Sequence, residues 1–357
     1  MIGFTFEKEQ AKLLSGSSYE IGRKHGEMFK DKIQISLKTY EKMFWEYSNL
    51  NWKKACEQAK LHLESIRKFN PNYLEEMEGI ATGASVSFED ILALNTRSEL
   101  ALVSKIDGCT SLYLTNSHND NTWLGQNWDW KSSQSESIIN ISLKQEGLPV
   151  INMITEAGII GKIGCNSAGI GVCLNALSTD TWKPKVPIHL GLRAILESNS
   201  LDKALSQINK NQMASAAHFL IASGEGKGIS AEVSPEYTSI LKEDEGTLIH
   251  TNHICSKKLK TMVSEYAIED SFNRLDTIEG QLSKIKEKNF NEVDLFNVLS
   301  NHKNYPNSIC RHESDEQPEK ERMETVFSIT MNLNEPKIFW IYGKPCEVQS
   351  GNVQRVM

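Results

Sequence analysis

The sequence Asp107-Gly108-Cys109-Thr110-Ser111 marks the point at which the pattern of the chain changes. Upstream, apolar residues recur three and four positions apart, as over 21–44, which is the period of an amphipathic helix. Downstream, short apolar runs such as 110–114 and 122–127 are separated by turn-forming residues, a pattern typical of strands and hairpins. The chain is therefore expected to begin as a helical segment and to continue as a mainly β segment, with the boundary at 107–110.

The predicted elements fall into two groups. Before the boundary, four helices are expected, at 21–44, 51–67, 71–83 and 87–102. After it, strands are expected at 110–114, 122–127, 137–143, 149–155, 159–164, 169–175, 218–223, 228–234, 237–241, 247–251, 324–333 and 337–342. Three further helices are expected at 190–210, 264–288 and 292–302. Runs of strands interrupted by a few helices favour an α+β fold, layered in the order αββα, over alternating βαβ units.

The composition argues against several kinds of partner and location. The 357 residues carry a net charge of −7 with no basic stripe, so neither nucleic acid nor a membrane surface is expected as a partner. No apolar run approaches ~18 residues, and the N-terminus becomes charged too early for a secretory signal. Seven irregularly spaced cysteines do not resemble a disulfide framework. A cytoplasmic location is expected, and the ending Arg355-Val356-Met357 does not support a peroxisomal one.

Cys109 is the first candidate for chemistry. A thiolate is a strong nucleophile, and the preceding glycine leaves the backbone accessible. Taken alone, a cysteine at the start of a strand is more often a small buried apolar residue. Asp129 ends an apolar strand between bulky aromatic residues, where a solvated carboxylate is not expected, although it could simply initiate a turn. If the two runs form a hairpin, Asp129 lies beside Cys109.

The run from Gly108 to Ser111, followed by Gly125-Gln126-Asn127-Trp128-Asp129-Trp130, resembles the acyl-coenzyme A:6-aminopenicillanate (isopenicillin-N) acyltransferase family, also called peptidase family C45. This family lies within the N-terminal-nucleophile (Ntn) hydrolases and is related to the choloylglycine and acid-ceramidase amidases. Further similar segments lie at 19–26, 75–81, 165–171, 174–177, 250–253 and 308–312. The resemblance implies a four-layer αββα Ntn-hydrolase sandwich preceded by a helical pro-segment.

In that family the precursor cuts itself before its nucleophilic cysteine. By resemblance, the cut falls between Gly108 and Cys109 and yields a helical chain, 1–108, and a catalytic chain, 109–357, which remain together as a heterodimer. The Cys109 thiol would attack the Gly108 carbonyl, and water would resolve the resulting thioester. The freed α-amine, whose pKa is ~7.7–8.0 in simple peptides, would then serve as base for its own thiol.

The resemblance also implies roles for four other residues. Asp129 would contact the freed amine, and Arg311 would pair near that aspartate and the nucleophile. Asn252 would donate a side-chain N–H to the oxyanion, and Asn175 would contribute to it through its backbone N–H. The plain alternatives are a turn residue at Asn252, a strand cap at Asn175 and a surface ion pair at Arg311. Gln126 stands where bile-salt amidases have arginine, which argues against bile-salt-like chemistry.

Histidines and cysteines offer a rival interpretation as metal ligands. His250, His253 and Cys255 are close in sequence, and His302 and His312 could join them. Zinc ligands usually occur in pairs at tighter, repeated spacing. Neither a metal nor any other cofactor is therefore expected.

The sequence thus predicts an enzyme, a self-processing cysteine Ntn amidohydrolase or acyltransferase. It would form an acyl-enzyme on Cys109 from a small N-acyl amide or amino-acid conjugate, with acyl-coenzyme A as a further candidate substrate. Release of the acyl group to water or to an amine is left open. Two alternatives also remain: an acyl-coenzyme A-dependent N-acyltransferase of the isopenicillin-N type, and a non-processing binding homologue.

Overall fold

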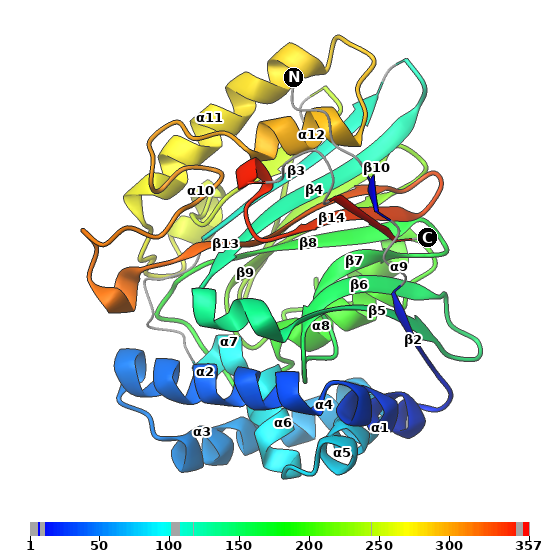
Figure 1. Ribbon diagram of the computed structural model, residues 1–357, viewed down its shortest axis with the longest axis vertical. Helices are drawn as coiled ribbons and strands as arrows, with labels where there is room; N and C mark the ends of the chain where they lie inside the picture. Colours follow the sequence, from blue (N-terminus) through cyan, green and yellow to red (C-terminus); the bar gives the residue numbers. More distant parts are fainter. Residues whose placement is uncertain are drawn as a thin grey trace.

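Two β-sheets face each other at the centre of the molecule, and helices cover the outer face of each (Figure 1). This computed structural model describes residues 6–7, 11–100, 108–116, 118–243, 245–347 and 353–356. Within these residues the first sheet has seven strands, in the order β1 (Phe6–Glu7), β15 (Val353–Val356), β14 (Lys337–Tyr342), β13 (Glu324–Asn332), β4 (Asn121–Trp130), β3 (Gly108–Asn116) and β12 (Thr247–His250). The second has eight, in the order β11 (Thr238–Leu241), β10 (Lys227–Val233), β9 (Ala217–Ser223), β8 (Ile170–Ala176), β7 (Ile163–Asn166), β6 (Ile151–Glu156), β5 (Ile138–Lys144) and β2 (Lys12–Ser15).

The helices form an outer layer on each side of the paired sheets. Helices α11 (Glu269–Ile285) and α12 (Glu292–Leu299), preceded by the short α10 (Lys257–Lys260), pack against the first sheet. Helices α8 (Ile188–Leu196) and α9 (Leu201–Ser206) pack against the second. The N-terminal helices gather at the lower edge of Figure 1: α1 (Ser18–Met28), α2 (Lys30–Ser48), α3 (Trp52–Ala59), α4 (Leu63–Phe69), α5 (Asn72–Ala84), α6 (Phe88–Asn95) and α7 (Arg97–Leu100). This order of layers confirms the predicted α+β fold with αββα architecture.

Glycines bring helices α1 and α5 into backbone contact. A Cβ atom at Gly22 would lie 2.0 Å from the carbonyl oxygen of Glu76, and one at Gly26 would lie 2.2 Å from that of Ile80. No larger residue fits at such a distance, so the two helices depend on glycine at these positions. The similar segments 19–26 and 75–81 therefore meet in space, which the sequence alone did not indicate.

Alternate residues of β3 face two different apolar cores. Cys109 and Tyr113 belong to the core between the two sheets, whereas Leu112 and Leu114 belong to the core beneath α11 and α12. Successive side chains of a strand point to opposite faces of its sheet. Cys109 thus projects between the sheets, and Gly108 lies on the side of the helices.

Several predicted elements have different bounds in the structure. The helix predicted at 21–44 is two helices, because Phe29 has a non-helical backbone (φ −119°, ψ 24°). The helix predicted at 190–210 is also divided, since Ser200 is extended and caps α9. Strand β2 was not predicted from the sequence; it pairs in parallel with β5. Asp107 and residues 101–102 of the helix predicted at 87–102 lie outside the described residues.

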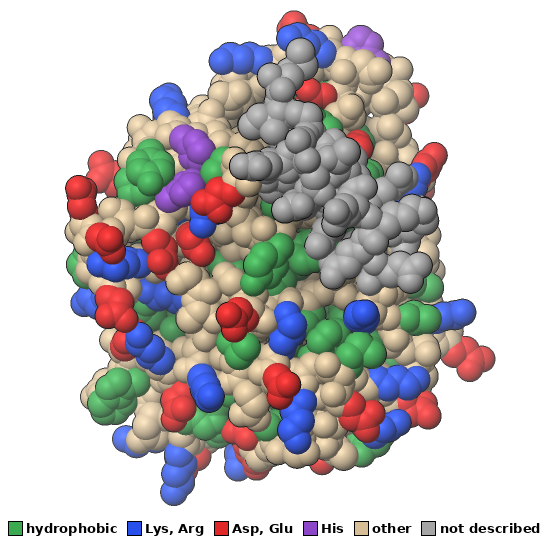
Figure 2. All heavy atoms as spheres, viewed as in Figure 1, with side chains coloured by type: hydrophobic (Ala, Val, Ile, Leu, Met, Phe, Trp, Pro, Cys, Tyr) green, Lys and Arg blue, Asp and Glu red, His purple; other side chains and the backbone are tan. Residues whose placement is uncertain are grey.

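Positive and negative side chains are interspersed over the face of the molecule shown in Figure 2. This distribution agrees with the scattering of lysine and arginine among acidic residues in the sequence. Among the described helices, none has both the length and the apolar character needed to cross a lipid bilayer.

Candidate active site

The β3–β4 hairpin places Gly108 directly opposite Asp129 and Cys109 opposite Trp128. The sequence predicted a hairpin with Asp129 beside Cys109, and the register puts Asp129 one residue away, opposite Gly108. A Cβ atom at Gly108 would stand 2.8 Å from both Cβ and Oδ2 of Asp129 and 3.1 Å from Arg311 Nε. These distances leave no room for a side chain. Glycine before Cys109 is therefore required by the close approach of Asp129, whatever its role in chemistry.

The backbone of Cys109 is held on both sides of its Cα atom. Its N–H donates to Asn252 Oδ1 at 2.7 Å, and its carbonyl oxygen accepts from Arg274 Nη1 at 2.5 Å. Arg274 also donates to Asn252 Oδ1 at 2.9 Å. Two obligate donors on Oδ1 fix the orientation of the Asn252 amide, whose nitrogen donates to the carbonyl oxygen of Ala176 at 3.1 Å. Asn252 thus contacts the backbone of Cys109 as an acceptor, whereas the family resemblance implied a donor role for its side chain.

Asp129 belongs to a buried ion network on the helix side of the hairpin, which we call the outer network (Asp129, Asp270, Arg274 and Arg311). Asp129 Oδ1 accepts from Thr325 Oγ1 at 2.7 Å, and its Oδ2 lies 3.5 Å from Arg311 Nε. Arg311 and Arg274 both bind the carboxylate of Asp270, at the start of α11. Burial raises the pKa of Asp129, although Arg311 and Arg274 oppose the shift. Burial acts to raise the pKa of Asp270, but the same two arginines outweigh burial and lower it.

Asn175 is buried on β8 and reaches across from the second sheet to the first. Its Oδ1 accepts from Ser111 Oγ at 2.6 Å and lies 2.9 Å from His218 Nδ1, and its Nδ2 donates to the carbonyl oxygen of His250. Ser111 lies on the same face of β3 as Cys109, two residues further on. The Asn175 side chain therefore joins the sheets near Cys109, by way of Ser111.

Gln126 also joins the two sheets. Its Nε2 donates to the carbonyl oxygen of Leu174, and its Oε1 accepts from the N–H of the same residue at 2.9 Å. Both ends of the side-chain amide are thus engaged with the backbone of β8. An arginine, which has no acceptor, would not reproduce this pair of bonds.

A second buried ion network, which we call the inner network (Arg97, Glu156 and Lys162), lies between the sheets. Glu156 Oε2 is 2.6 Å from Lys162 Nζ and 3.0 Å from Arg97 Nη2. Lys162 Nζ stands 3.6 Å from the ring centroid of Trp128, the residue opposite Cys109. Burial lowers the pKa of Lys162 to about 8, against the opposing effects of Glu156 and of the Cys109 thiol. Despite burial, Arg97 and Lys162 lower the pKa of Glu156 to about 2.

Several residues of these networks were not found from the sequence. Glu156 and Lys162 offered a signal, because both interrupt the apolar stretch 151–163, where an unpaired charge is costly. Asp270 and Arg274 offered none, since a charged amphipathic helix carries many such residues. The contact of Arg274 with Cys109, and of Asp270 with Arg311, depends on how α11 packs on the first sheet.

The structure divides the candidate metal ligands into two groups. One consists of Glu232, His250 and Cys255, and the other of His302, Cys310, His312 and Cys346. The sequence had associated His302 and His312 with the group around His250, and Cys346 had not been considered. The second group is brought together by segments that are distant in sequence.

Comparison with known proteins agrees with the resemblance drawn from the motifs. Residues 115–346 match the family described as acyl-coenzyme A:6-aminopenicillanic acid acyl-transferase. The chain is 34% identical over 322 residues (89% of this chain, 88% of the relative) to the acyl-coenzyme A:6-aminopenicillanic-acid-acyltransferase 40 kDa form of Emericella nidulans. Among solved structures it is similar to a mutant of conjugated bile acid hydrolase from Clostridium perfringens (13% identity, TM-score 0.47, covering 69% of this chain and 96% of that one). Penicillin V acylase from Agrobacterium tumefaciens is also similar (14% identity, TM-score 0.42, 66% and 83%).

Proposed function

The chain belongs to the acyl-coenzyme A:6-aminopenicillanic acid acyltransferase family, and on this premise we propose that it cleaves itself between Gly108 and Cys109. It is an enzyme of the acyl-transferring or amide-hydrolysing Ntn class. In our proposal Cys109, once freed, is the nucleophile that accepts an acyl group from a small N-acyl amide, an amino-acid conjugate or acyl-coenzyme A. Its compartment in this proposal is the cytoplasm, a reducing setting that suits seven cysteines without a disulfide.

The observation that carries this proposal is the environment of the Gly108–Cys109 peptide bond. Gly108 is pressed against Asp129, and the backbone of Cys109 is held by Asn252 and Arg274. Among the described residues, no donor makes a hydrogen bond to Asp129 Oδ2, although that atom is buried. Cleavage would create an ammonium group at Cys109, next to this carboxylate. The reaction itself would therefore supply a hydrogen-bond donor to Asp129 Oδ2.

Self-cleavage would proceed in two balanced steps. The Cys109 sulfur attacks the carbonyl carbon of Gly108, the C–N bond breaks, and the proton lost by the thiol passes to the new amine. Water then hydrolyses the thioester, which releases the Gly108 carboxylate and restores the thiol. The side chain of Cys109 is only 2% exposed in the uncleaved chain, so cleavage also has to precede access of a larger substrate.

The mature enzyme would use the α-amine of Cys109 as base for its own thiol. Asp129 would hold this amine, with Arg311 beside it. The Asn252 amide N–H would stabilise the oxyanion once it is released from Ala176, and the backbone N–H of Asn175 would be the second donor. The acyl-enzyme would then pass its acyl group to water or to an amine.

The two products, 1–108 and 109–357, would remain associated as a heterodimer. Arg193 donates two hydrogen bonds to Glu76, at 2.9 and 2.8 Å, with both side chains buried. Glu99 accepts from the N–H of Ile188 at 2.9 Å and from Ser215 at 3.0 Å. These contacts cross the proposed boundary and do not involve the scissile bond.

The intact mass of freshly purified protein, with a denaturing gel, tests the proposal. We expect two fragments from wild type, the larger beginning at Cys109, and one full-length chain from Cys109→Ala. Cys56→Ala is the matched control and should be cleaved like wild type. A wild-type protein that stays in one chain, with activity that survives Cys109→Ala, would contradict the proposal and favour a non-processing homologue.

Acyl transfer from coenzyme A is a second candidate for the mature reaction, supported by the similarity to the Emericella nidulans acyltransferase. A panel of N-acyl amino acids and amides should be assayed for hydrolysis. The same enzyme should be assayed for acyl-coenzyme A consumption with and without 6-aminopenicillanate. Acceptor-dependent thioester consumption would favour transfer of the isopenicillin-N type, and release of free amine without a thioester would favour hydrolysis.

A further inference from the structure

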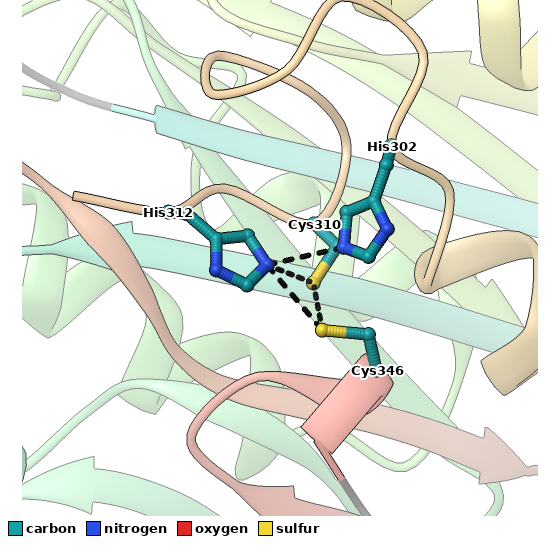
Figure 3. A group of neighbouring side chains, drawn as sticks. All are labelled: His302, Cys310, His312 and Cys346. Atoms are coloured by element: carbon teal, nitrogen blue, oxygen red, sulfur yellow. Dashed lines mark hydrogen bonds between the residues drawn. The ribbon is translucent and has the colours of Figure 1, made fainter. Parts of the chain in front are cut away.

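Four side chains with metal-binding atoms converge between α12 and the end of β14 (Figure 3). His302 follows α12, Cys310 and His312 lie in the connection from α12 to β13, and Cys346 lies in the short 3-10 helix η4 (Pro345–Glu347). One nitrogen or sulfur atom of each lies within 4.8 Å of the corresponding atoms of the other three. Figure 3 shows all four side chains pointing toward one another.

The distances between these atoms are close to those between the corners of a small tetrahedron. The two Nε2 atoms of His302 and His312 are 3.1 Å apart, and the two sulfur atoms of Cys310 and Cys346 are 3.5 Å apart. His312 Nε2 lies 3.8 Å from Cys310 Sγ and 3.3 Å from Cys346 Sγ. Tetrahedral zinc, with Zn–S of ~2.3 Å and Zn–N of ~2.0–2.1 Å, places neighbouring ligand atoms roughly 3.3–3.8 Å apart. A sulfur–sulfur distance of 3.5 Å is too long for a disulfide bond of ~2.05 Å.

We propose that His302, Cys310, His312 and Cys346 bind one zinc ion. Two thiolates and two imidazoles form the ligand set that tetrahedral Zn²⁺ favours, and the two thiolates balance its charge. Four protein ligands leave no open coordination position, so the ion has a structural role. The sequence did not reveal this site, because the ligand spacing of 302, 310, 312 and 346 lacks the short repeated pairs of common zinc motifs.

The other group of potential ligands does not form such a site. The Glu232 carboxylate already accepts from the N–H groups of Cys255 and Ser256, and its Oε1 lies 2.9 Å from His250 Nε2. Its oxygens are thus occupied by protein donors. This arrangement explains the burial of Glu232 without an ion.

Zinc at this position would hold Arg311 in place, a consequence that rests on the proposed function. Arg311 lies between the ligands Cys310 and His312 and reaches Asp129 from there. The same segment is tied to β4, because Asn127 Nδ2 donates to the carbonyl oxygen of Ile309 at 2.9 Å. The zinc ligands are therefore positioning residues for Arg311 and do not touch the reacting atoms.

Elemental analysis of untagged protein, purified without chelators and under reducing conditions, tests the site. We expect about one zinc ion per chain. Cobalt(II) added to the chelator-treated protein should produce thiolate-to-cobalt charge-transfer bands and the ligand-field bands of a tetrahedral site. Zinc should also raise the melting temperature of the chelator-treated chain, because the metal binds only the folded state.

Variants assign the metal to these residues. His302 is exposed, so His302→Ala should fold, lose most of its zinc and weaken the cobalt bands. Cys346→Ser should do the same, while the controls His118→Ala and Cys255→Ser should keep one zinc. Absence of zinc from wild type together with absence of cobalt bands would overturn the proposal, and so would loss of zinc in Cys255→Ser with retention in His302→Ala. Cleavage at Gly108 is scored separately by mass, so failure of either proposal can be recognised without the other.

Discussion

The two buried ion networks lie on opposite faces of the same hairpin and differ in what they touch. The outer network contacts the backbone of Cys109 through Arg274 and packs Asp129 against Gly108. The inner network surrounds Trp128 and lies on the side to which the Cys109 thiol projects. We infer that the outer network holds the peptide bond that we propose is cut, whereas the inner network sets the electrostatic surroundings of the thiol.

The networks also differ in where their residues lie in the sequence. All members of the outer network follow Cys109. In the inner network, Arg97 comes from the segment before Gly108, and Tyr40 from the same segment donates to Glu156. The N-terminal segment would therefore remain part of the thiol's surroundings after cleavage. Such a role would account for the buried contacts of the N-terminal segment with the second sheet and its helices, which do not depend on the peptide bond between the two segments.

Removal of Asn252 is expected to have the largest effect. In the precursor, Asn252→Ala removes the acceptor for the Cys109 N–H and with it the arrangement that holds the scissile bond. In the mature enzyme it removes the proposed oxyanion donor, and loss of such a donor costs ~10²–10³ in rate. Mass spectrometry of precursor made in a cell-free system would measure the cleavage rate. Asn140→Ala, at another buried asparagine, is the control and should leave the rate near wild type. A rate within tenfold of wild type for Asn252→Ala would remove Asn252 from the mechanism.

Loss of the positive charge of Lys162 in the inner network is expected to have a smaller effect. Lys162→Met should slow cleavage roughly tenfold, since Lys162 interacts electrostatically with the Cys109 thiol and a nearby cation is worth ~1–2 kcal/mol to a thiolate in a partly screened site. It should also destabilise the fold, because Glu156 would lose a buried partner. The double variant Lys162→Met/Glu156→Gln separates the two effects. Recovery of the melting temperature without recovery of the rate would support an electrostatic role, and recovery of both would leave a structural role only.

The two networks also show which parts of the site could be predicted from the sequence and which could not. The hairpin from Cys109 to Asp129 was predictable, because alternating apolar runs and a polar turn fix the pairing of neighbouring strands. The approach of Arg311 to Asp129 came from a family resemblance, and the structure places the two side by side. Arg274 and Arg97 could not be found in this way. Their contacts depend on helix packing between segments far apart in sequence, which no local pattern encodes.

Arg97→Met tests whether the N-terminal segment remains part of the site. Arg97 lies over the rings of Tyr40 and Trp130, at 5.1 and 5.0 Å, and binds Glu156, which keeps Lys162 as a partner in the variant. We therefore expect cleavage within about threefold of wild type and a loss of roughly 1–2 kcal/mol in stability. Size-exclusion chromatography of the cleaved protein in increasing urea would show the fragments separating at lower urea than wild type. Unchanged separation would place Arg97 outside the contact between the two chains.

The pH dependence of cleavage is expected to distinguish the two networks most directly. The pKa of Lys162 is lowered to about 8 from an ordinary value of 10.5, so its ammonium is present below about pH 8 and is lost as the pH rises through that value. The part of the rate that depends on this cation should therefore decline above pH 8, by no more than the roughly tenfold effect of Lys162→Met. The same lowered pKa has the opposite effect on the free energy of unfolding, which increases over this pH range. Between about pH 8 and 10.5 the unfolded chain binds a proton that the folded chain lacks. The destabilisation caused by burying the Lys162 ammonium is therefore relieved as the pH rises. A decline in cleavage rate above pH 8 that persists in Lys162→Met would assign it to another group, and its disappearance in that variant would assign it to the inner network.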